Sequence, residues 1–505
     1  MNTVVDAGTK VTSHRFLIMA ALLATFMQAM NISIPNAAVL YLEGALSMTD
    51  DELGWVFTSY IAASAIVFPM THWLAGRFGR RRVFQVSMAL FSLGLILDTL
   101  ATTPLQFVAA RILQGAASGT LAPLSISILL DELPPLRHGH IGIVWSVTAL
   151  LGMLSGPGIG GWLSEYAGWR SIFYLSLPLA AFASLTMGLY LREKKAQKSP
   201  PFDFFGVATF SMGVVGLQML LDRGERMEWF ASPEIWAEAA ASVLGFYLYI
   251  VHVLTKDEHF LHKDLFKDRN FGLATVMFFA LGFVLLPTLA LTSPMLEELF
   301  GYPAHTAGYL TIPRGVALVG ALLLTWSPPA RIDNRLFVIG GLGLAIYGNW
   351  LMLGYSPLMD RWPVIWAGAS QGAGLGILLP ALTRAAFSTL DAKFRSEGTI
   401  FFNMSRLYGS TIGIAIVQIF LFNNTQSMHL ALAKNLRPYR LGGDAGGSLS
   451  MQGLAMMNDL VTSQAAVIAI IDQFKILMVA LLVVSPLALL LRKPRPATKV
   501  PGVAK

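Results

Sequence analysis

Long apolar stretches alternate with short polar segments along the whole chain. A helix needs about 20 mainly apolar residues to cross a bilayer, and fourteen stretches have that length. They are 16–40, 52–74, 83–101, 105–129, 141–163, 170–191, 203–221, 234–254, 271–293, 307–326, 336–354, 363–384, 398–421 and 474–491. The first stretch has the length of a span and lacks a signal-peptide cleavage pattern, so we expect it to be retained as a span. The pattern predicts an all-α polytopic membrane protein with 14 transmembrane helices.

The basic residues orient these predicted spans. When the N-terminus is placed inside and the spans alternate, the inside segments hold about three times as many Lys and Arg residues as the outside segments. This bias is typical of cytoplasmic loops, so we expect both termini to be cytoplasmic. Three arginines, Arg111, Arg314 and Arg406, remain inside spans.

The chain repeats part of its own sequence. The segment Gln114–Pro123 recurs 257 residues later as Gln371–Pro380, with Gln, Gly, Ala, Leu and Pro at matching places. With the same offset, Gly152 and Gly156 match Gly409 and Gly413. Parallel halves of this kind occur in transporters. The matched segments lie in spans 4 and 12 and in spans 5 and 13, so the repeat predicts two six-span bundles with spans 7 and 8 inserted between them.

Composition narrows the class further. Only 13% of the residues are charged, about half the share of an average soluble protein. Cys is absent, which excludes disulfides, thiolate metal sites and cysteine nucleophiles. We interpret the net charge of +7 mainly as an orientation signal, so no nucleic acid partner is expected.

Metal and nucleotide sites are not expected either. The chain has no GxxxxGK[ST] sequence, which argues against an ATP-driven pump. Five histidines lie in loops or at span ends without the spacing of metal ligands, and we expect them to be solvated: His72, His138, His140, His252 and His262.

Three motifs lie in or beside the spans. The first inside loop contains Gly76, Arg77, Gly79, Arg80 and Arg81. Span 4 contains Arg111-x-x-Gln114-Gly115, and span 5 contains Gly152, Gly156, Pro157, Gly160 and Gly161. Small residues allow helices to approach closely in lipid, and Pro157 removes a backbone hydrogen bond. Span 5 is therefore interpreted as a seal or pivot between the two halves, with ordinary helix packing as the alternative.

These motifs resemble the loop, fourth-helix and fifth-helix signatures of the major facilitator superfamily, the last of which marks its antiporters. Two extra central spans are typical of the fourteen-span drug:proton antiporter branch, and the chain resembles the EmrB-type inner-membrane multidrug efflux pumps. The resemblance implies the major facilitator fold, with two six-helix pseudo-symmetric bundles at 1–200 and 257–505 and two inserted linker helices within 201–256. It also implies a location in the bacterial inner membrane.

The resemblance implies a function as well. Such pumps are secondary active exporters that move amphipathic toxic compounds outward by alternating access. They use the proton gradient as energy source and need no cofactor, and they are not enzymes. The implied partners are an amphipathic small molecule, protons, the lipid bilayer, a periplasmic adaptor protein and an outer-membrane channel. Two alternatives stay open: a dedicated metabolite exporter of the same fold, and a non-transporting membrane sensor or scaffold.

The chain departs from the family pattern at two positions. The loop motif has Gly76 where the family usually has an acidic residue, and span 1 has Asn31 where an Asp often lies. The proton-coupling residue must then be found elsewhere. Asp98, toward the outer end of span 3, is the candidate, because burial lets a carboxyl group load and release protons near neutral pH. The alternative is an interfacial acid that is wetted from outside.

Polar residues inside spans are candidates for the substrate and proton cavity. Arg111 and Gln114 share one helix face and are expected to line it; the alternative is a structural arginine satisfied by backbone carbonyls. Arg406 is the comparable charge in the second half, whereas Arg314 is assigned to snorkelling or packing. Four further residues complete the predicted cavity: Gln28 and Asn31 on span 1, and Phe402 and Asn403 on span 13. For span 1, helix–helix hydrogen bonding is the alternative.

The longest interval between spans, 422–473, is predicted to face the periplasm. It contains the flexible stretch Gly442–Ser448 between helical-looking segments at Met428–Leu436 and Met456–Ile470. The resemblance suggests that this loop docks the adaptor. The alternative is a tolerated surface excursion.

Overall fold

The predicted spans all form helices. The computed structural model describes residues 2–133, 138–191, 203–224, 227–255, 265, 267–326, 333–391, 394–435 and 451–492, and these contain no β-strand. The α-helices are α1 (Asn2–Ser33), α2 (Val39–Leu46), α3 (Asp50–Val67), α4 (Thr71–Phe78), α5 (Arg80–Leu100), α6 (Pro104–Glu132), α7 (His138–Ala167), α8 (Ser171–Tyr174), α9 (Ser176–Tyr190), α10 (Phe204–Arg223), α11 (Pro233–Thr255), α12 (Arg269–Pro294), α13 (Ala304–Trp326), α14 (Asn334–Met352), α15 (Arg361–Phe387), α16 (Arg395–Asn435), α18 (Met451–Val484) and α19 (Leu487–Leu490). Short helical turns occupy η1 (Ile34–Ala38), η2 (Phe68–Met70), η4 (Trp229–Ala231) and η6 (Met295–Leu299).

Side chains at the helix starts explain where several helices begin. Thr103 accepts a hydrogen bond from the amide of Gln106 at the start of α6. Asp268 and Asp333 accept from backbone amides in the first turns of α12 and α14. These oxygens satisfy amides that have no partner within the helix.

The helices are long and apolar enough to cross a membrane. Within the described residues, thirteen helical segments of at least 18 residues have the length and hydropathy of a membrane span. The 30-residue α7, at the place of the fifth predicted span, is not among the thirteen, and with it every one of the fourteen predicted spans has a helix. The predicted fold class is confirmed.

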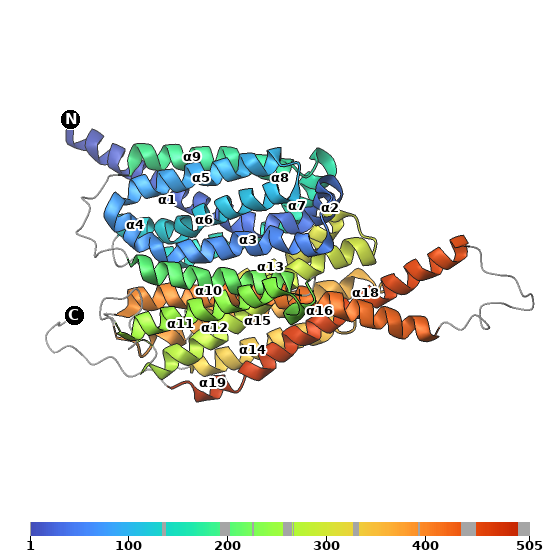
Figure 1. The fold of residues 1–505 in the computed structure, drawn as a ribbon. Helices are drawn as coiled ribbons and strands as arrows, with labels where there is room; N and C mark the ends of the chain where they lie inside the picture. The colour runs from blue at the N-terminus through green and yellow to red at the C-terminus, as the bar shows by residue number, and fades with distance from the viewer. Residues whose placement is uncertain are drawn as a thin grey trace, which may run out of the picture.

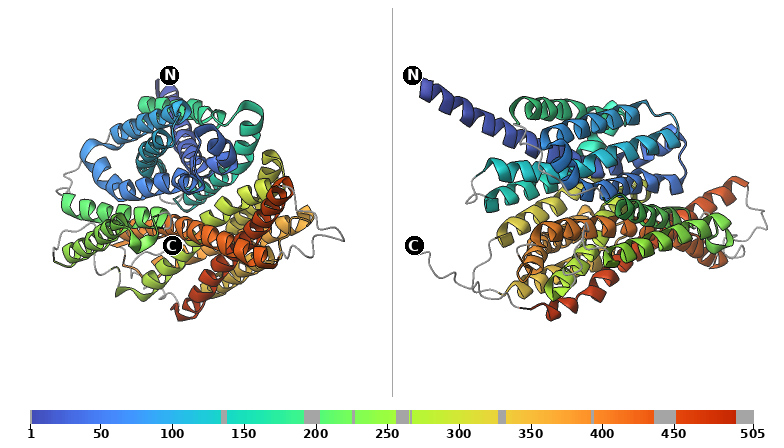
Figure 2. Two further views of the ribbon diagram at one scale, coloured as in Figure 1. Left: turned by 45° about the vertical axis from the view of Figure 1, so that its right-hand side comes forward. Right: turned by 60° about the vertical axis from the view of Figure 1, so that its left-hand side comes forward.

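The chain builds two helical bundles that lie against each other. Helices α1, α3, α5, α6, α7 and α9 pack together, and α12 to α16 pack with α18. Figure 1 shows the blue-to-cyan first bundle above the yellow-to-red second bundle, and the first and last described residues of the chain lie toward the same end of the molecule, called here the end of the termini. The two bundles meet along α7 with α13 and along α3 with α16, as the two further views of Figure 2 also show.

The sequence repeat corresponds to repeated helix contacts. A Cβ atom added to Gly115 on α6 would lie 2.3 Å from the carbonyl oxygen of Tyr60 on α3. Gly372 on α15, its partner in the repeat, lies in the same way against the carbonyl oxygen of Arg314 on α13, at 2.1 Å. Glycine is required at both positions because any side chain would collide with backbone. The two bundles are therefore related by pseudo-symmetry at the level of individual contacts.

The two inserted helices form a hairpin beside the seam between the bundles. Helices α10 and α11 pack mainly on each other, and α10 touches both α3 and α16. At one end of the hairpin, Arg223 pairs with Glu234 and with Glu238, the latter at 2.6 Å. An ion pair thus ties α10 to α11 at this end.

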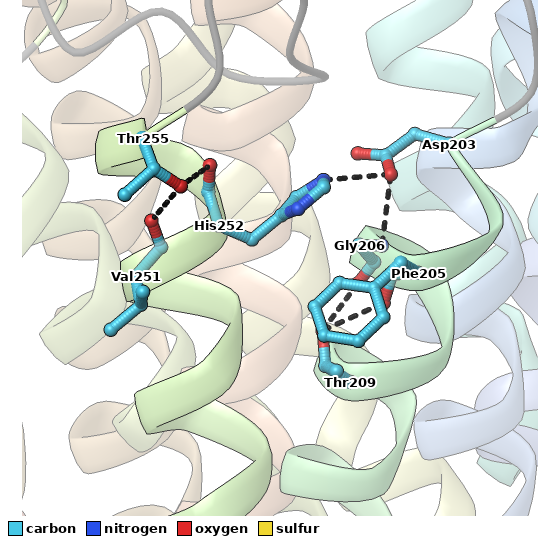
Figure 3. A network of polar contacts seen from close by, with 7 residues as sticks. All are labelled: Asp203, Phe205, Gly206, Thr209, Val251, His252 and Thr255. Carbon is cyan, nitrogen blue, oxygen red and sulfur yellow. Dashed lines mark hydrogen bonds and ion pairs between the residues drawn. The ribbon is translucent and has the colours of Figure 1, made fainter.

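At the other end of the hairpin, a histidine contacts a carboxylate. Nε2 of His252 on α11 lies 2.8 Å from Oδ1 of Asp203, which also caps α10 by accepting from the amide of Gly206 (Figure 3). The ring of Phe205 packs on the imidazole. His252 is only 6% exposed, so the expectation that it is solvated is wrong. Its carboxylate partner comes from a residue 49 positions earlier, which spacing within α11 does not reveal.

Two helices extend beyond the membrane at the end opposite the termini. Helix α16 has 41 residues, about 60 Å at 1.5 Å per residue, whereas the hydrocarbon core is about 30 Å thick. Its last turns and the first turns of α18 project together, and Nε2 of His429 lies 3.2 Å from Oδ1 of Asn458 between them (Figure 1). The helical segments expected in the 422–473 interval are thus continuations of the membrane helices. The stretch Gly442–Ser448 lies outside the described residues.

Candidate functional site

A buried arginine lies at the centre of the first bundle. Arg111 on α6 is completely buried. Its Nε donates to the carbonyl of Val56 at 3.0 Å, its Nη2 to the carbonyl of Asn31 at 3.2 Å, and its Nη1 to Oε1 of Gln114. The guanidinium also lies 4.4 Å from the ring centroid of Tyr60. A buried guanidinium needs such acceptors because burying an unsatisfied charge is very costly. Arg111 thereby holds α1, α3 and α6 together.

Asn31 extends this network to a fourth helix. Its Nδ2 donates to the carbonyl of Met27 and to Oγ of Ser176 on α9, both at 2.9 Å, and its Oδ1 accepts from Nε2 of Gln114 at 3.3 Å. An ionised Asp has no donor for the Met27 carbonyl. The amide of Asn31 therefore fits its hydrogen-bond partners at a position where the family often has Asp.

Asp98 lies beside the network without a hydrogen bond. It is 0% exposed, and both carboxylate oxygens are buried with no hydrogen-bond partner among the described residues. Asp98 lies one helical turn after Gly94, which packs directly on Gln114. The Asp98 carboxyl group also interacts electrostatically with Arg111. The alternative of an acid wetted from outside is not what the structure shows. Asp98 is therefore a buried carboxyl group beside Arg111 that makes no hydrogen bond within the described residues.

The predicted residues of the second bundle lie apart from this network. Phe402 is buried and stacked on Phe278 with ring centroids 4.0 Å apart, and Asn403 donates to the carbonyl of Thr399 on its own helix. Arg406 is half-buried, and its carbonyl lies against Gly282 of α12. Within the described part of the chain, no hydrogen bond or ion pair joins these residues to Arg111. The structure therefore brings together Asn31, Asp98, Arg111 and Gln114, with the Gln28 carbonyl accepting from Tyr60, but not the residues of α16.

A second polar cluster, which sequence reasoning missed, occupies the other bundle. Nε2 of Gln371 donates to Oγ1 of Thr288 at 3.1 Å and to Oδ1 of Asn349 at 3.0 Å. Nη2 of Arg314 donates to the carbonyl of Leu285 at 3.1 Å. The repeat contained the signal, because it pairs Gln371 with Gln114. The repeat does not reveal Thr288, Asn349 or Arg314, because the corresponding positions of the first bundle have other residue types.

The loop motif forms the turn between α4 and α5. Gly79 has φ 88°, a backbone conformation that residues with a side chain rarely adopt. Its N–H donates to the Ala75 carbonyl, so proline cannot replace it either. Arg80 pairs with Asp131 at the end of α6. Arg77 and Arg81 are exposed, and Gly76 is half-buried. The motif thus ties the α4–α5 turn to α6 at the end where the termini lie.

The span 5 motif contacts both bundles. Added Cβ atoms at Gly152, Gly156 and Gly160 would collide with Phe26, Ser33 and Ile34 on α1 and η1. One at Gly161 would lie 2.6 Å from the carbonyl of Ala304 on α13, in the other bundle. Gly308 of α13 in turn packs on Pro157 and Gly158. The motif therefore lets α7 approach α1 within its own bundle and α13 across the seam.

A carboxylate–histidine contact joins the bundles at the end opposite the termini. Nδ1 of His305 on α13 lies 2.7 Å from Oε2 of Glu165 on α7, and the His305 amide donates to the same oxygen at 3.3 Å. Toward the other end, an open apolar groove of about 430 Å³ lies between α1 and α7. It is lined by Arg15, Ile18, Met19, Leu22, Leu23, Phe26 and Thr148.

Comparison with known proteins decides the family. The model of the Major Facilitator Superfamily matches residues 21–422. The chain belongs to the Major Facilitator Superfamily. It is 30% identical over 425 residues to the multidrug export protein EmrB of Haemophilus influenzae, covering 84% of this chain and 83% of that protein. It is 30% identical over 450 residues to EmrB of Escherichia coli, covering 87% and 86%. It is 29% identical over 482 residues to the fatty acid resistance protein FarB of Neisseria gonorrhoeae, covering 94% and 95%.

Solved structures agree on the fold. A bacterial homologue of the human lysosomal transporter Spinster, in an inward-facing and unoccupied conformation, aligns with TM-score 0.64 at 14% identity and covers 96% of this chain and 99% of its own. The nucleoside transporter NupG aligns with TM-score 0.60 at 12% identity, covering 93% and 99%. The predictions of a superfamily transporter of the EmrB-like type, of a non-enzyme and of a multi-pass bacterial inner-membrane protein are confirmed.

Proposed function

We propose that this superfamily member is a proton-driven exporter of amphipathic toxic compounds. The relatives named as multidrug export and fatty acid resistance proteins support the direction and the kind of substrate. The observation that carries the proton coupling is Asp98, a completely buried carboxyl group without a hydrogen bond that interacts with Arg111. The energy source is the proton gradient, and the mechanism needs no cofactor.

Proton binding at Asp98 acts through Arg111. When Asp98 is ionised, its charge attracts the guanidinium; when it is protonated, this attraction is lost and Arg111 is held only by its other acceptors. Those acceptors lie on α1, α3 and α6. A change of charge on α5 thus alters the forces between four helices of the first bundle, which is how a proton would bias one arrangement of the bundle over another.

Alternating access is proposed to occur by movement of the bundle at 1–200 against the bundle at 257–505, with the hairpin within 201–256 beside the seam. The seam along α7 and α13 has glycines at its close contacts, and such small residues let the two helices approach closely. The pair of Glu165 and His305 keeps one end of the seam together. We assign the closed end to the periplasm and the end with both termini to the cytoplasm.

The proposed substrate cavity lies between the bundles. It takes its first wall from the network of Arg111 and its second wall from Arg406 and its neighbours on α16. The residues are Gln28, Asn31, Arg111, Gln114, Phe402, Asn403 and Arg406. Because Arg111 and Asn31 are completely buried here, they meet substrate only in a conformation in which the bundles have moved.

The projecting ends of α16 and α18 are proposed to dock a periplasmic adaptor, which in turn meets an outer-membrane channel. They carry large apolar side chains that are exposed beyond the membrane, namely Leu430, Met456 and Leu460. Lipid does not cover side chains at that distance from the bilayer, so a protein partner is the natural cover. Cross-linking from a Cys introduced at Leu460 to the adaptor tests the docking.

The test of proton coupling uses Asp98→Asn in proteoliposomes with an imposed pH gradient. The substitution removes the titratable group and keeps the size of the side chain, so substrate-triggered proton release should disappear while expression and thermal stability are retained. The matched control is Asp360→Asn, which preserves a helix cap at the start of α15. Wild-type proton release from Asp98→Asn refutes the assignment. Release with only one compound supports a dedicated exporter, and no flux from the unmodified protein supports a sensor.

A further inference from the structure

The second bundle contains a buried arginine whose position is related to the first by the pseudo-symmetry. Gly115 packs on Tyr60, and Gly372 packs on Arg314, so Arg314 takes the place of Tyr60. The repeat places Gly368 where the first bundle has Arg111. A Cβ atom on Gly368 would lie 3.4 Å from Cβ of Arg314, so this glycine leaves room for the Arg314 side chain. Each bundle therefore buries one arginine in equivalent surroundings, but on a different helix.

The two arginines also reach equivalent acceptors. Nη2 of Arg111 donates to the Asn31 carbonyl on α1, and Nη2 of Arg314 donates to the Leu285 carbonyl on α12. Both α1 and α12 are the first helix of their bundle. The guanidinium of Arg314 reaches α12 at Leu285, about one helical turn from Thr288, to which Gln371 donates.

The two sites differ in their countercharge. Gly94 on α5 packs on Gln114, and Gly348 on α14 packs on Gln371, so one turn further Asp98 corresponds to Met352. Met352 is buried and apolar. Among the described residues, the one titratable side chain that interacts electrostatically with Arg314 is Tyr355, and no acid does so. The second site therefore has the cation of the first without its anion.

Hydrogen-bonding groups at the second site remain unused. Arg314 is 4% exposed, and its Nε has no hydrogen-bond partner among the described residues. Gln371 is completely buried, and its Oε1 likewise has none, although Nε2 binds Thr288 and Asn349. A buried guanidinium with a free donor and no acid is costly unless an acceptor of negative charge reaches it.

We propose that Arg314, with the polar cluster of Thr288, Asn349 and Gln371, is an anion-binding site of the second bundle. The ligand is a carboxylate or an anion of similar size, and it supplies the charge that Asp98 supplies in the first bundle. The proposal rests on the proposed export function only where it names the ligand that supplies the anion, an amphipathic compound with a carboxylate headgroup. A small inorganic anion is the other source of the same chemistry. The nearly complete burial of Arg314 means that the anion enters when the bundles move.

The test measures binding in the purified full-length protein without a proton gradient. The probes are octanoate, 1-octanol and chloride at constant ionic strength, and the readout is the unfolding midpoint followed by the fluorescence of the 11 tryptophans. Octanoate should raise the midpoint of the unmodified protein and 1-octanol should not. In Arg314→Gln the octanoate concentration needed for half of this effect should rise by about tenfold or more, because a charged hydrogen bond is lost. Arg314→Lys should retain part of the effect.

A second variant keeps the proposal testable if Arg314→Gln fails to fold. Met352→Asp introduces an acid at the place that corresponds to Asp98 and leaves Arg314 in position. Met352→Asp should abolish the octanoate effect, because the new carboxylate pairs with the Arg314 guanidinium in place of the ligand. Met352→Leu should retain the effect. An equal response to chloride and octanoate supports the site and assigns it to an inorganic anion. An octanoate effect that persists in both Arg314→Gln and Met352→Asp overturns the proposal, as does equal stabilisation by 1-octanol.

Failure here and failure of the proposed function are distinguishable. The binding measurement involves no transport and no proton movement, so loss of proton coupling in Asp98→Asn leaves it unchanged. Conversely, a protein that exports in exchange for protons but shows no Arg314-dependent anion effect retains the proposed function and loses only this site.

Discussion

The carboxylate of Glu165 lies 2.7 Å from Nδ1 of His305, and this pair joins α7 of the first bundle to α13 of the second. The rings of Tyr166 and Tyr309 flank the imidazole. The two bundles must separate at this end if they are to expose a cavity there. The pair therefore marks a contact that alternating access has to break.

Tethering Glu165 to His305 should stop transport. The chain has no Cys, so the double variant Glu165→Cys/His305→Cys carries the only two thiols and can be joined by a short, reducible bis-methanethiosulfonate reagent. We expect substrate efflux from vesicles to fall to background after cross-linking and to recover after reduction. Each single variant, treated identically, is the control. Undiminished efflux from fully cross-linked protein contradicts the proposed movement.

Replacing Arg111 by Lys should destabilise the first bundle. The three nitrogens of the guanidinium reach acceptors on three helices, whereas Lys has a single nitrogen and cannot reach all of them. Loss of one such charged hydrogen bond lowers the free energy of unfolding by about 1.5–3 kcal/mol. Thermal unfolding in detergent measures this loss. Ile112→Val, at the next residue and 48% exposed, is the control, and equal stability of the two variants would show that the acceptors are dispensable.

The glycines of the span 5 motif should differ in their tolerance of alanine. A Cβ atom at Gly156 would lie 2.1 Å from Oγ of Ser33 and 2.8 Å from the amide of Ile34, while one at Gly158 would meet nothing within 4 Å. Gly156→Ala should reduce stability by about 1–3 kcal/mol through overpacking and reduce efflux, and Gly158→Ala should preserve both. The comparison needs unfolding midpoints and initial efflux rates of both variants. Similar behaviour of the two alanines argues against close packing of α7 on α1.

Asp203 performs two tasks that substitution can separate. It caps α10 through the amide of Gly206 and pairs with His252 (Figure 3). Asn caps a helix as well as Asp does but carries no charge, so Asp203→Asn tests the contribution of the carboxylate charge beside His252 alone. Asp203→Ala loses both and should cost about 1 kcal/mol more, the usual contribution of a cap. The unfolding midpoints of the two variants at neutral pH decide this, and identical midpoints would mean that the cap contributes nothing.

Much of the architecture follows from the sequence alone. The fourteen apolar stretches, the distribution of basic residues and the repeat from Gln114 to Gln371 predict the number of helices and the two bundles. These features are local or periodic, because the bilayer sets the length of a span and the repeat sets the pseudo-symmetry. The glycines of span 5 were likewise visible as close-packing positions, although which helix each one contacts was not.

The partners of the charged residues were decided by the tertiary structure. Asp98 and Arg111 are 13 positions apart on neighbouring helices, and Asp203 contacts His252, which lies 49 positions later, because the hairpin brings the start of α10 beside the end of α11. Arg314 is the clearest example. From the sequence we expect its side chain to snorkel or pack, but the fold buries it beside Gly368, at the position that corresponds to Tyr60 in the first bundle. Whether a buried charge has a counterion depends on which side chains converge from separate helices, and the sequence of one helix contains no information about the faces of the others.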